Sequence, residues 1–460
     1  MSRLLARIKV MATYAVITLP LTGHMRPMMA AVRALRQAGH RAVIVGPIDL
    51  IRRVPNDIET LIIGQKDLPE GALDALCSCL SRMTSLSDML QMFGVVATLS
   101  RLYLNYLPKA IETLGVDGIL HDQLEPAAGI VARGLSHADP GFQHISLACA
   151  LPMNREPLVP PPFTGWRYRS DRFGAWLNAG YYRVVNWLLR EQNQVLADGA
   201  TYFGLSKPEG LEDWQQVWTV DDGLSRTLDL AQGLASLDYP RTHPPLYLGP
   251  FRDKVQSYPD YASIEHERDG RPLCFISLGS LMGGRASTLR AMAKGASDRG
   301  LQPIVVHGGR IDSDEVIWPS GSIVRDFLNQ QDILSQCSAA VLHGGYNSTT
   351  DAVAAGVPIV TVPMAFEQGA IAARVERAGL GRTVGLRGPS LSQRIRLALG
   401  DVLESAEIAQ SVRQARYEAM AAHGLPGFVA AVEGQARQTL KNLSSKRVKT
   451  VTYDWMQPAE

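Results

Sequence analysis

The stretch His343-Gly-Gly-Tyr-Asn-Ser-Thr-Thr-Asp351 decides the fold of this chain. It joins a β-like run, 338–342, to a helix-like run, 346–355, through a pair of glycines. Glycine lets the backbone approach a ligand closely, and a helix N-terminus offers free N–H groups and the positive end of the helix dipole. Histidine and hydroxyl side chains add donors suited to phosphate oxygens. The stretch therefore predicts a pyrophosphate-binding turn between a strand and a helix.

A second polar pair, Glu367-Gln368, follows the next strand-like run, 357–363. Asp351 places a carboxylate one helix turn beyond the predicted phosphate turn, and Glu367 places another after the following strand. A diphosphate-binding turn with carboxylates on either side suits a nucleotide-sugar, whose ribose and hexose hydroxyls both need acceptors.

The composition excludes several classes of protein. The chain has 460 residues, so two or three domains are expected. Its 46% hydrophobic and 20% charged residues are typical of a globular protein, and its net charge of +2 predicts no nucleic-acid partner. No uncharged apolar run reaches ~18 residues, so no transmembrane helix is expected. The first ten residues lack the apolar core of a secretory signal; they indicate an upstream start before Met11 or, alternatively, a weak basic anchor.

The five cysteines do not form a metal-binding pattern. Cys77-Ser-Cys79 has a one-residue gap and no second pair, which argues against zinc. Cys149, Cys274 and Cys337 lie in apolar runs, where core packing is the expected role. This usage suits a reducing cytoplasm.

Strand-like and helix-like runs alternate through most of the chain. In the first half the strand-like runs are 14–19, 41–45, 118–121 and 143–147, and the helix-like runs are 26–38 and 125–135. After 272 the strand-like runs are 273–278, 303–307, 322–325, 339–342 and 358–362. Continuous apolar strands alternating with helices predict an α/β fold with two doubly wound parallel sheets, which bind ligands at the carboxyl ends of their strands.

Domain boundaries follow from shifts in composition. Residues 1–250 are expected to form an acceptor-binding domain, 251–271 a polar linker, 272–425 a nucleotide-sugar-binding domain, and 426–460 a C-terminal helix and tail. Within the first domain, 151–194 is rich in proline and then in aromatic residues. This excursion suits either the wall of an apolar acceptor pocket or plain packing of an extra helix.

His24 is the candidate general base. It follows the first strand on a glycine-containing turn, at the sheet edge where ligands bind, and its ordinary pKa near ~6.5 suits it to take a proton from a hydroxyl. Asp122 ends another strand and is the candidate carboxylate that would orient the imidazole. A helix-capping role for Asp122 stays open. His121 competes with Asp122, but a strand alternates its faces, so only one of the two can face the cleft.

Several known motifs are absent from the sequence. There is no strand-linked G-x-G-x-x-G and no G-x-x-x-x-G-K-[ST], which disfavours a dehydrogenase and a P-loop enzyme. No Asp-x-Asp pair follows a strand, so metal-free catalysis is expected. Gly279-Ser280 repeats the pattern of a strand, a glycine and a hydroxyl, and predicts a further phosphate contact.

The ordered set 343–351, Gly356-Val-Pro358, Val362-Pro363 and Glu367-Gln368 resembles the nucleotide-sugar signature of the inverting UDP-glycosyltransferases. The match extends to Gly23, His24 and Pro27, to Gly279-Ser280 and to 327–330. The family has the GT-B fold, two facing Rossmann-like halves with a cleft between them. The resemblance implies no metal and no cofactor, with UDP-glucose as donor substrate.

The resemblance also implies a role for each matching residue. Phe327 would stack on uracil, Gln330 would contact the uridine, and Asp351 would bind the ribose. His343, Asn347 and Ser348 would hold the diphosphate, and Glu367 and Gln368 the sugar hydroxyls. His24 would be the base, oriented by Asp122. The full set expected at the donor site is Gly23, Gly279, Ser280, Phe327, Leu328, Gln330, His343, Gly345, Asn347, Ser348, Asp351, Glu367 and Gln368.

Some positions depart from the plant members of the family, which commonly carry Trp at 327, Glu at 351 and Asp at 367. A phenylalanine still stacks on a base, but Asp351 is a methylene shorter than Glu, and Glu367 weakens the expectation of glucose.

A narrower resemblance, over 122–127, 150–157, 363–368 and 371–374, is to bacterial zeaxanthin glucosyltransferases of carotenoid biosynthesis. It implies a cytoplasmic enzyme, compatible with peripheral association at the inner face of the membrane, that glucosylates ring hydroxyls of a lipophilic acceptor. The alternatives are a transferase for an antibiotic, flavonoid or lipid, and a catalytically weak nucleotide-sugar-binding protein.

Overall fold

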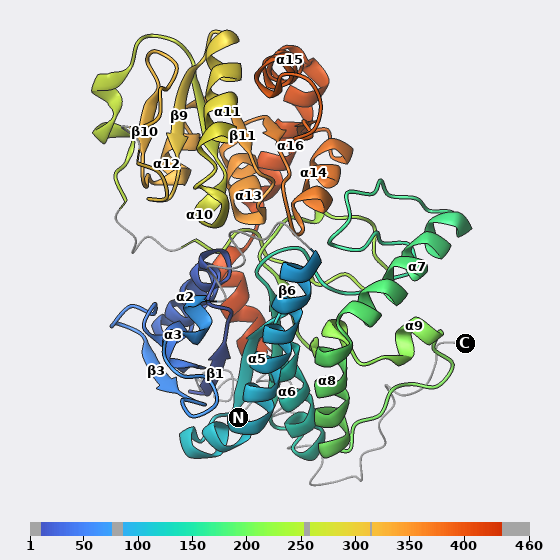
Figure 1. Cartoon of the computed structure of the whole chain (residues 1–460). Helices are drawn as coiled ribbons and strands as arrows, with labels where there is room; N and C mark the ends of the chain where they lie inside the picture. Colours follow the sequence, from blue (N-terminus) through green and yellow to red (C-terminus); the bar gives the residue numbers. More distant parts are fainter. Residues whose placement is uncertain (1–10, 76–85, 253–257, 313–314, 435–460) are drawn as a thin grey trace, which may run out of the picture.

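A computed structural model of the chain describes residues 11–75, 86–252, 258–312 and 315–434, without the side chains of 86–93. Two lobes, each built on a parallel sheet, face each other (Figure 1). Cys77, Cys79 and the two chain ends lie outside the described residues, so the predictions made for them are not addressed. Among the described helices none has the length and apolar character needed to cross a membrane.

The N-terminal lobe contains a seven-stranded sheet in the order β3-β2-β1-β4-β5-β6-β7, with every neighbouring pair parallel. Its strands are β1 (Thr13–Ile17), β2 (Arg41–Gly46), β3 (Glu59–Ile62), β4 (Gly118–Asp122), β5 (Gln143–Ala148), β6 (Asp229–Ala231) and β7 (Leu246–Tyr247). The central strands β4 and β5 are buried along their whole length, because helices cover both faces of the sheet.

The C-terminal lobe contains a six-stranded parallel sheet in the order β10-β9-β8-β11-β12-β13. Its strands are β8 (Leu273–Ser277), β9 (Gln302–Val306), β10 (Ile323–Arg325), β11 (Cys337–Leu342), β12 (Ile359–Thr361) and β13 (Gly381–Thr383). The predicted α/β class with two doubly wound sheets is therefore confirmed.

Helices cover the sheets of both lobes. The first lobe has α2 (Thr22–Gln37), α3 (Ile48–Ile51), α5 (Leu86–Leu114), α6 (Pro126–Ala138), α7 (Arg172–Leu188), α8 (Arg190–Tyr202) and α9 (Asp213–Gln216). The second has α10 (Gly279–Met282), α11 (Ala286–Asp298), α12 (Gln330–Leu334), α13 (Tyr346–Ala355), α14 (Gln368–Arg377), α15 (Leu391–Glu404) and α16 (Ala406–Ala421). Short 3₁₀ turns lie at η1 (Val220–Gly223), η2 (Ala235–Leu237), η3 (Tyr261–Ser263) and η4 (Glu265–Glu267).

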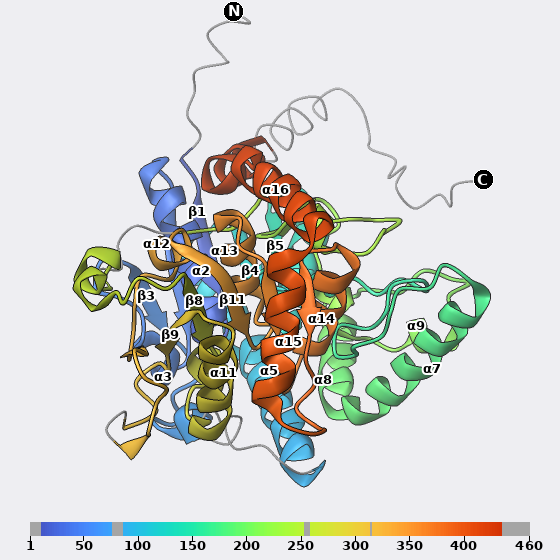
Figure 2. The same cartoon turned by 90° about the horizontal axis from the view of Figure 1, so that it is seen from above.

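Each lobe has its own apolar core, and the chain crosses between the lobes more than once. A helix at 424–434 returns to the first lobe, where Phe428 packs edge-on against Phe251 with ring centroids 5.4 Å apart. Helix α7, from the proline- and aromatic-rich excursion, projects at the rim of the molecule (Figure 2). The excursion is therefore a helix that stands apart from the sheet.

Both sheets reverse their strand order once, between β1 and β4 in the first lobe and between β8 and β11 in the second. Ligands of doubly wound sheets bind where the order reverses, because the loops there leave in opposite directions and open a crevice. His24 follows β1 and Asp122 ends β4, while Gly279 follows β8 and His343 follows β11. All four therefore lie at reversal points.

Helix α2 begins at Thr22, four residues before the expected start at Arg26. The spacing of the apolar residues indicated a later start, but α2 also contains Pro27, and a proline near a helix N-terminus removes only one backbone hydrogen bond. His24 consequently lies in the first turn of a helix and not on the loop that precedes it.

Candidate active site

A cleft of about 1830 Å³ lies between the lobes. Every residue predicted at the donor site lines it, from Gly23 to Gln368, and so does His24. Asp122 does not line the cleft but lies behind His24, with only 1% of its side chain exposed. Single ligand pockets usually hold ~300–1,000 Å³, so this cleft has room for two substrates.

The first-lobe reversal point holds an imidazole–carboxylate pair. His24 Nδ1 lies 2.7 Å from Asp122 Oδ2. The parallel pairing of β1 with β4 ends both strands at the same edge, which brings the two residues together across 98 positions of sequence. Because Nδ1 is bound to the carboxylate, Nε2 is the ring nitrogen that remains for a substrate hydroxyl.

The pKa of His24 is set by opposing effects. Burial lowers it, but the charge of Asp122 and its hydrogen bond outweigh burial, and Glu367 adds to them, so the pKa lies above the ordinary value. The pKa of Asp122 is lowered, since His24 and other donors overcome burial. The pair is therefore held as a carboxylate beside an imidazole of raised basicity.

Two further donors hold Asp122 in place. Oδ1 accepts from the backbone N–H of Leu124 at 2.9 Å, and the thiol of Cys149 donates to the carboxylate. Cys149 was expected to be core packing; it is buried in the core of the first lobe and also borders the cleft beside this pair. His24, Asp122 and Cys149 form the one group of metal-ligating side chains found in the part of the chain that the structure describes, and hydrogen bonding among them accounts for their closeness.

The structure also distinguishes the two alternatives for the end of β4, which were His121 as the residue facing the cleft and Asp122 as a helix cap. His121 faces away from the cleft, where it stacks on His144 at a ring distance of 5.2 Å. Burial lowers the pKa of His121 to about 4, so it is neutral at physiological pH. The N-cap of α6 is Glu125, without a side-chain cap bond. Asp122 therefore closes the turn before this helix through Leu124 and does not cap the helix itself.

The second reversal point holds His343 between two glycines. A side chain at Gly279, where φ is +71°, would approach the His343 ring to 2.8 Å, and one at Gly345 would also collide with that ring. Gly344 has φ +83°, and a side chain there would lie 2.9 Å from the carbonyl of Gln368. The glycines thus make room for the protein's own groups. Burial lowers the pKa of His343 to about 4, so its neutral ring can donate one hydrogen bond but carries no charge near pH 7.

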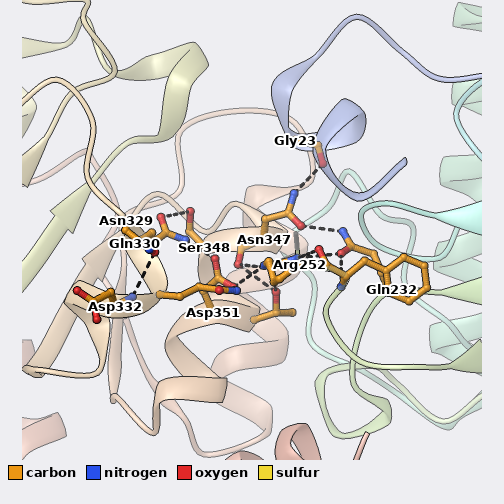
Figure 3. A network of polar contacts seen from close by, with 12 residues as sticks. Gly23, Gln232, Arg252, Asn329, Gln330, Asp332, Asn347, Ser348 and Asp351 are labelled. Atoms are coloured by element: carbon orange, nitrogen blue, oxygen red, sulfur yellow. Dashed lines mark hydrogen bonds and ion pairs between the residues drawn. The ribbon is translucent and has the colours of Figure 1, made fainter. Parts of the chain in front are cut away.

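The carboxylate of Asp351, which lines the cleft, is held by a polar network (Figure 3). Oδ2 accepts from the amide of Gln330 at 2.6 Å, and Oδ1 forms an ion pair with Arg252 Nε at 2.6 Å. Ser348 donates to the amide oxygen of Gln330 at 3.2 Å. These groups, predicted to bind uridine, ribose and phosphate, are thus gathered in one place and pre-oriented by Arg252, a residue that the sequence did not single out.

Asn347 joins the lobes. Its Nδ2 donates to the carbonyl of Gly23 at 2.7 Å, and its Oδ1 accepts from Gln232 Nε2 at 2.7 Å (Figure 3). The side chain is therefore engaged by the first lobe, so a phosphate at the start of α13 would meet the backbone N–H of Asn347 and not its amide.

Aromatic rings stack at the outer end of the donor side. Phe327, 42% exposed, stacks on Tyr258 with ring centroids 5.4 Å apart, and Arg26 lies over the Tyr258 ring. Leu328 is buried in the core of the second lobe while still lining the cleft. Phe327 thus offers a planar surface of the kind that a base can stack on.

The loop between β12 and α14 carries the predicted sugar contacts. Phe366 has φ 55°, a strained value for a non-glycine residue, and precedes Glu367. The amide oxygen of Gln368 accepts from the N–H groups of Met364 and Ala365, which leaves its amide nitrogen for a ligand. Burial raises the pKa of Glu367, while the charge of His24 lowers it. Glu367 and His24 therefore interact electrostatically across the cleft.

Sequence reasoning missed several residues that line the cleft. Arg310 donates to the carbonyl of Ser280 and adds a cation beside the predicted phosphate contacts. On the other side, burial raises the pKa of Glu125 to about 8, so this carboxyl is largely protonated at neutral pH; Ser100 donates to it at 3.3 Å. None of these residues belongs to a local motif, so only the folded arrangement reveals them.

Comparisons with known proteins agree with this geometry. Residues 302–432 match the family model described as the C-terminal domain of erythromycin biosynthesis protein CIII-like proteins. The glycotransferase of kitacinnamycin superposes with a TM-score of 0.69 at 18% identity, covering 92% of this chain and 99% of that one. The calicheamicin glycosyltransferase CalG4 gives 0.67 at 18% identity, covering 93% and 99%. The chain is a glycosyltransferase with the GT-B fold.

More extensive sequence similarity is to two bacterial enzymes. The zeaxanthin glucosyltransferase of Pantoea ananas is 29% identical over 381 residues, 81% of this chain and 84% of that protein. The zeaxanthin glucosyltransferase of Pseudescherichia vulneris is 28% identical over 432 residues, 92% of this chain and 98% of that protein. The resemblance noted from the motifs thus extends over most of the chain.

Proposed function

We propose that this glycosyltransferase moves glucose from UDP-glucose to a ring hydroxyl of a lipophilic acceptor of the zeaxanthin type, with inversion at the anomeric carbon. The observation that carries the proposal is the His24–Asp122 pair, whose Nδ1–Oδ2 distance is 2.7 Å, at the edge of a cleft whose other wall carries the donor signature. A binding protein without turnover has no need of a base with raised pKa at this position.

The reaction is a direct displacement. Nε2 of His24 takes the proton of the acceptor hydroxyl while the oxygen of that hydroxyl forms a bond to the anomeric carbon. The bond from that carbon to the phosphate oxygen breaks on the opposite face, and UDP leaves with the electron pair. Asp122 stabilises the imidazolium that forms. Holding both substrates in one cleft supplies much of the rate, and general-base catalysis adds ~10²–10⁴-fold.

Groups of the second lobe would stabilise the negative charge of the leaving diphosphate. Backbone N–H groups at the start of α13, the neutral ring of His343 and the guanidinium of Arg310 line the same part of the cleft. Together they provide charge-assisted hydrogen bonds without a metal ion. Activity that is unchanged by a chelator is expected, and loss of activity on chelation with recovery on addition of Mg²⁺ would contradict this assignment.

The acceptor wall supports an apolar substrate. Its side chains come from the proline-rich loop and from α7; they include Pro161, Phe163, Tyr181 and Val185. The similarity to zeaxanthin glucosyltransferases, at 28–29% identity over most of the chain, points to a carotenoid diol. This wall also suits other lipophilic alcohols, and the antibiotic glycosyltransferases that share the fold make them the second candidate class.

The test is a crossed assay of donors and acceptors read by mass spectrometry. The donors are UDP-glucose and dTDP-glucose, because a structure with this fold, the glycosyltransferase VinC, is described in complex with DTDP. The acceptors are zeaxanthin, a flavonol and a macrolide aglycone. Mono- and diglucosides of zeaxanthin formed from UDP-glucose are the expected products, and a β-anomeric product by NMR supports inversion. Exclusive glycosylation of the macrolide would replace the carotenoid assignment.

A further inference from the structure

Helix α7 exposes an apolar stripe to solvent. Trp176 is 68% exposed and Trp187 62% exposed, and the residues between them that share this face are also exposed. The stripe consists of Phe173, Trp176, Gly180, Val184 and Trp187. A spacing of three and four positions places all five on one face of the helix.

Arginines flank the stripe. Residues 163–190 contain five arginines, at 167, 169, 172, 183 and 190, and a single acidic residue, Asp171, which is paired with Arg169. The guanidinium of Arg190 lies over the ring of Trp187, and that of Arg169 over Phe173. The face that α7 presents is therefore both aromatic and strongly basic.

The opposite side of α7 belongs to the cleft. Tyr181, Tyr182 and Val185 line the cleft between the lobes, and Tyr182 also stacks on Trp214. One helix thus has a wall of the acceptor site on one side and an exposed aromatic stripe on the other. Figure 2 shows α7 at the outer edge of the molecule, away from the two sheets.

We propose that the stripe of α7 docks on the surface of an anionic lipid bilayer. Tryptophan and phenylalanine insert at the depth of the lipid headgroups, and arginines beside them are attracted to negatively charged lipids. An interface between protein partners would not need a flank of a single charge sign. Docking in this orientation places α7, which forms one wall of the acceptor site, against the bilayer in which a lipophilic alcohol dissolves.

The proposal does not depend on the identity of the acceptor, because binding is measured without substrates. Full-length protein is floated with vesicles of phosphatidylcholine, alone or mixed with phosphatidylglycerol. Wild-type protein is expected to float with the mixed vesicles and not with phosphatidylcholine alone. The variant Trp176→Ser/Trp187→Ser should lose about tenfold in the bound fraction, and Arg183→Glu a similar amount.

Matched controls come from α16, which also carries exposed apolar and basic residues. Tyr417 is 70% exposed and Met420 73% exposed, and Tyr417→Ser/Met420→Ser and Arg413→Glu should leave vesicle binding unchanged. Equal thermal unfolding of all variants excludes misfolding. Two results of the flotation assay would overturn the proposal: binding only to the neutral vesicles, or an equal loss of binding in the control variants. A third is a dimer in light scattering that becomes a monomer in the tryptophan variant, because the stripe would then be the contact with a second copy of the chain.

A second inference comes from the contact between Asn347 and Gly23, and it rests on the proposed function. Residue 27 is a proline inside α2, and proline has no N–H to donate to the carbonyl four positions earlier. That carbonyl is Gly23 O, which instead accepts from Asn347 Nδ2 at 2.7 Å. The proline and the interlobe hydrogen bond are therefore two parts of one arrangement.

We infer that Asn347 is a positioning residue for the base. It sits in the first turn of the donor-site helix α13 and holds the backbone of the residue next to His24. Gln232, from the loop after β6, fixes the orientation of the Asn347 amide at 2.7 Å. The contact sets the distance between the donor helix and the imidazole, so it should affect turnover more than binding.

The decisive variant is Pro27→Ala, which restores an N–H for Gly23 O within the helix and so competes with Asn347. Thermal stability should stay equal or rise, since alanine favours the helix interior, while kcat falls about tenfold and the Kd for free UDP is unchanged. Asn347→Ala should reproduce the fall in kcat, and Asn347→Asp should not rescue it, because a carboxylate cannot donate. Unchanged kcat in Pro27→Ala would overturn the inference, whereas no transfer by the wild type would instead overturn the proposed function.

Discussion

The two histidines at the strand-order reversals occupy similar places and have opposite chemistry. His24 follows β1 in the first lobe and His343 follows β11 in the second. Both are largely enclosed, and burial lowers the pKa of each. For His24 the carboxylate of Asp122 reverses the effect, whereas the pKa of His343, packed between glycines, falls to about 4. One neighbouring carboxylate separates an imidazole of raised pKa from a neutral hydrogen-bond donor.

Under the proposed function, this difference lets one fold, used twice, support two tasks. A base must gain a proton during the reaction, and a carboxylate on its second nitrogen stabilises the resulting cation. A phosphate ligand needs only to donate, and a close carboxylate would repel the diphosphate. Among the residues that the structure describes, no carboxylate contributes to the pKa of His343, which fits the proposed role of its ring as a neutral donor.

The largest effect is expected at His24. His24→Ala should lower transfer by about 10²–10⁴-fold, because alanine cannot take the proton of the acceptor hydroxyl. The Kd for UDP, measured by calorimetry, should stay within a factor of about two, since UDP contacts belong to the second lobe. A variant that turns over at the wild-type rate would show that His24 is not the base.

The second-largest effect is expected at Asp122, and it distinguishes the role of this carboxylate from that of the His24 ring. Wild-type kcat/KM should fall as the pH drops through a pKa above 6.5, because only neutral His24 accepts a proton. In Asp122→Asn the rate should fall by about 10²-fold or more. Its acid limb should also move to lower pH, because burial then acts without the opposing charge. A pH–rate profile of the two proteins tests this, and identical acid limbs would reduce Asp122 to a structural residue.

A smaller effect is expected at the second histidine. His343→Ala removes the donor and cannot titrate, so the acid limb should stay where it is, while the KM for UDP-glucose rises roughly tenfold through loss of a hydrogen bond of about 1.5 kcal/mol. Initial rates at several donor concentrations and pH values give both quantities. A shift of the acid limb in this variant would mean that His343 also changes its protonation state, and would break the contrast with His24.

Much of this arrangement could be predicted from the sequence where the signal is local. The helix expected at 346–355 has the same bounds in α13, because Gly345 precedes it and Gly356, at φ 77°, ends it in the left-handed conformation. The predicted pairing of His24 with Asp122 followed from two strand ends that share a sheet edge. Patterns of this kind survive folding, since they depend on a few neighbouring residues.

Contacts without a local signal could not be predicted. Arg252 lies at the edge of a polar linker and binds Asp351 from 99 positions away. Gln232 follows a strand of three residues, and the apolar run that holds Cys149 predicts its burial in the core but not its hydrogen bond to Asp122. The role of Asn347 was predicted from family resemblance alone, and its side-chain bonds to Gly23 and Gln232 depend on how the lobes meet. These contacts join residues that are far apart in the sequence, so only the tertiary structure reveals them.

The smallest effect is expected at Glu367, which couples the two sides of the cleft. Glu367→Gln removes a charge that raises the pKa of His24, so the acid limb should move slightly to lower pH, in the same direction as in Asp122→Asn but by less. It also replaces one of the two acceptor oxygens by an amide donor, so the KM for UDP-glucose should rise about fivefold while the Kd for free UDP is unchanged. Both readings come from one set of rate and calorimetric data. Equal weakening of UDP-glucose and UDP would place Glu367 outside the sugar site, and the contrast between the two histidines would then rest on Asp122 alone.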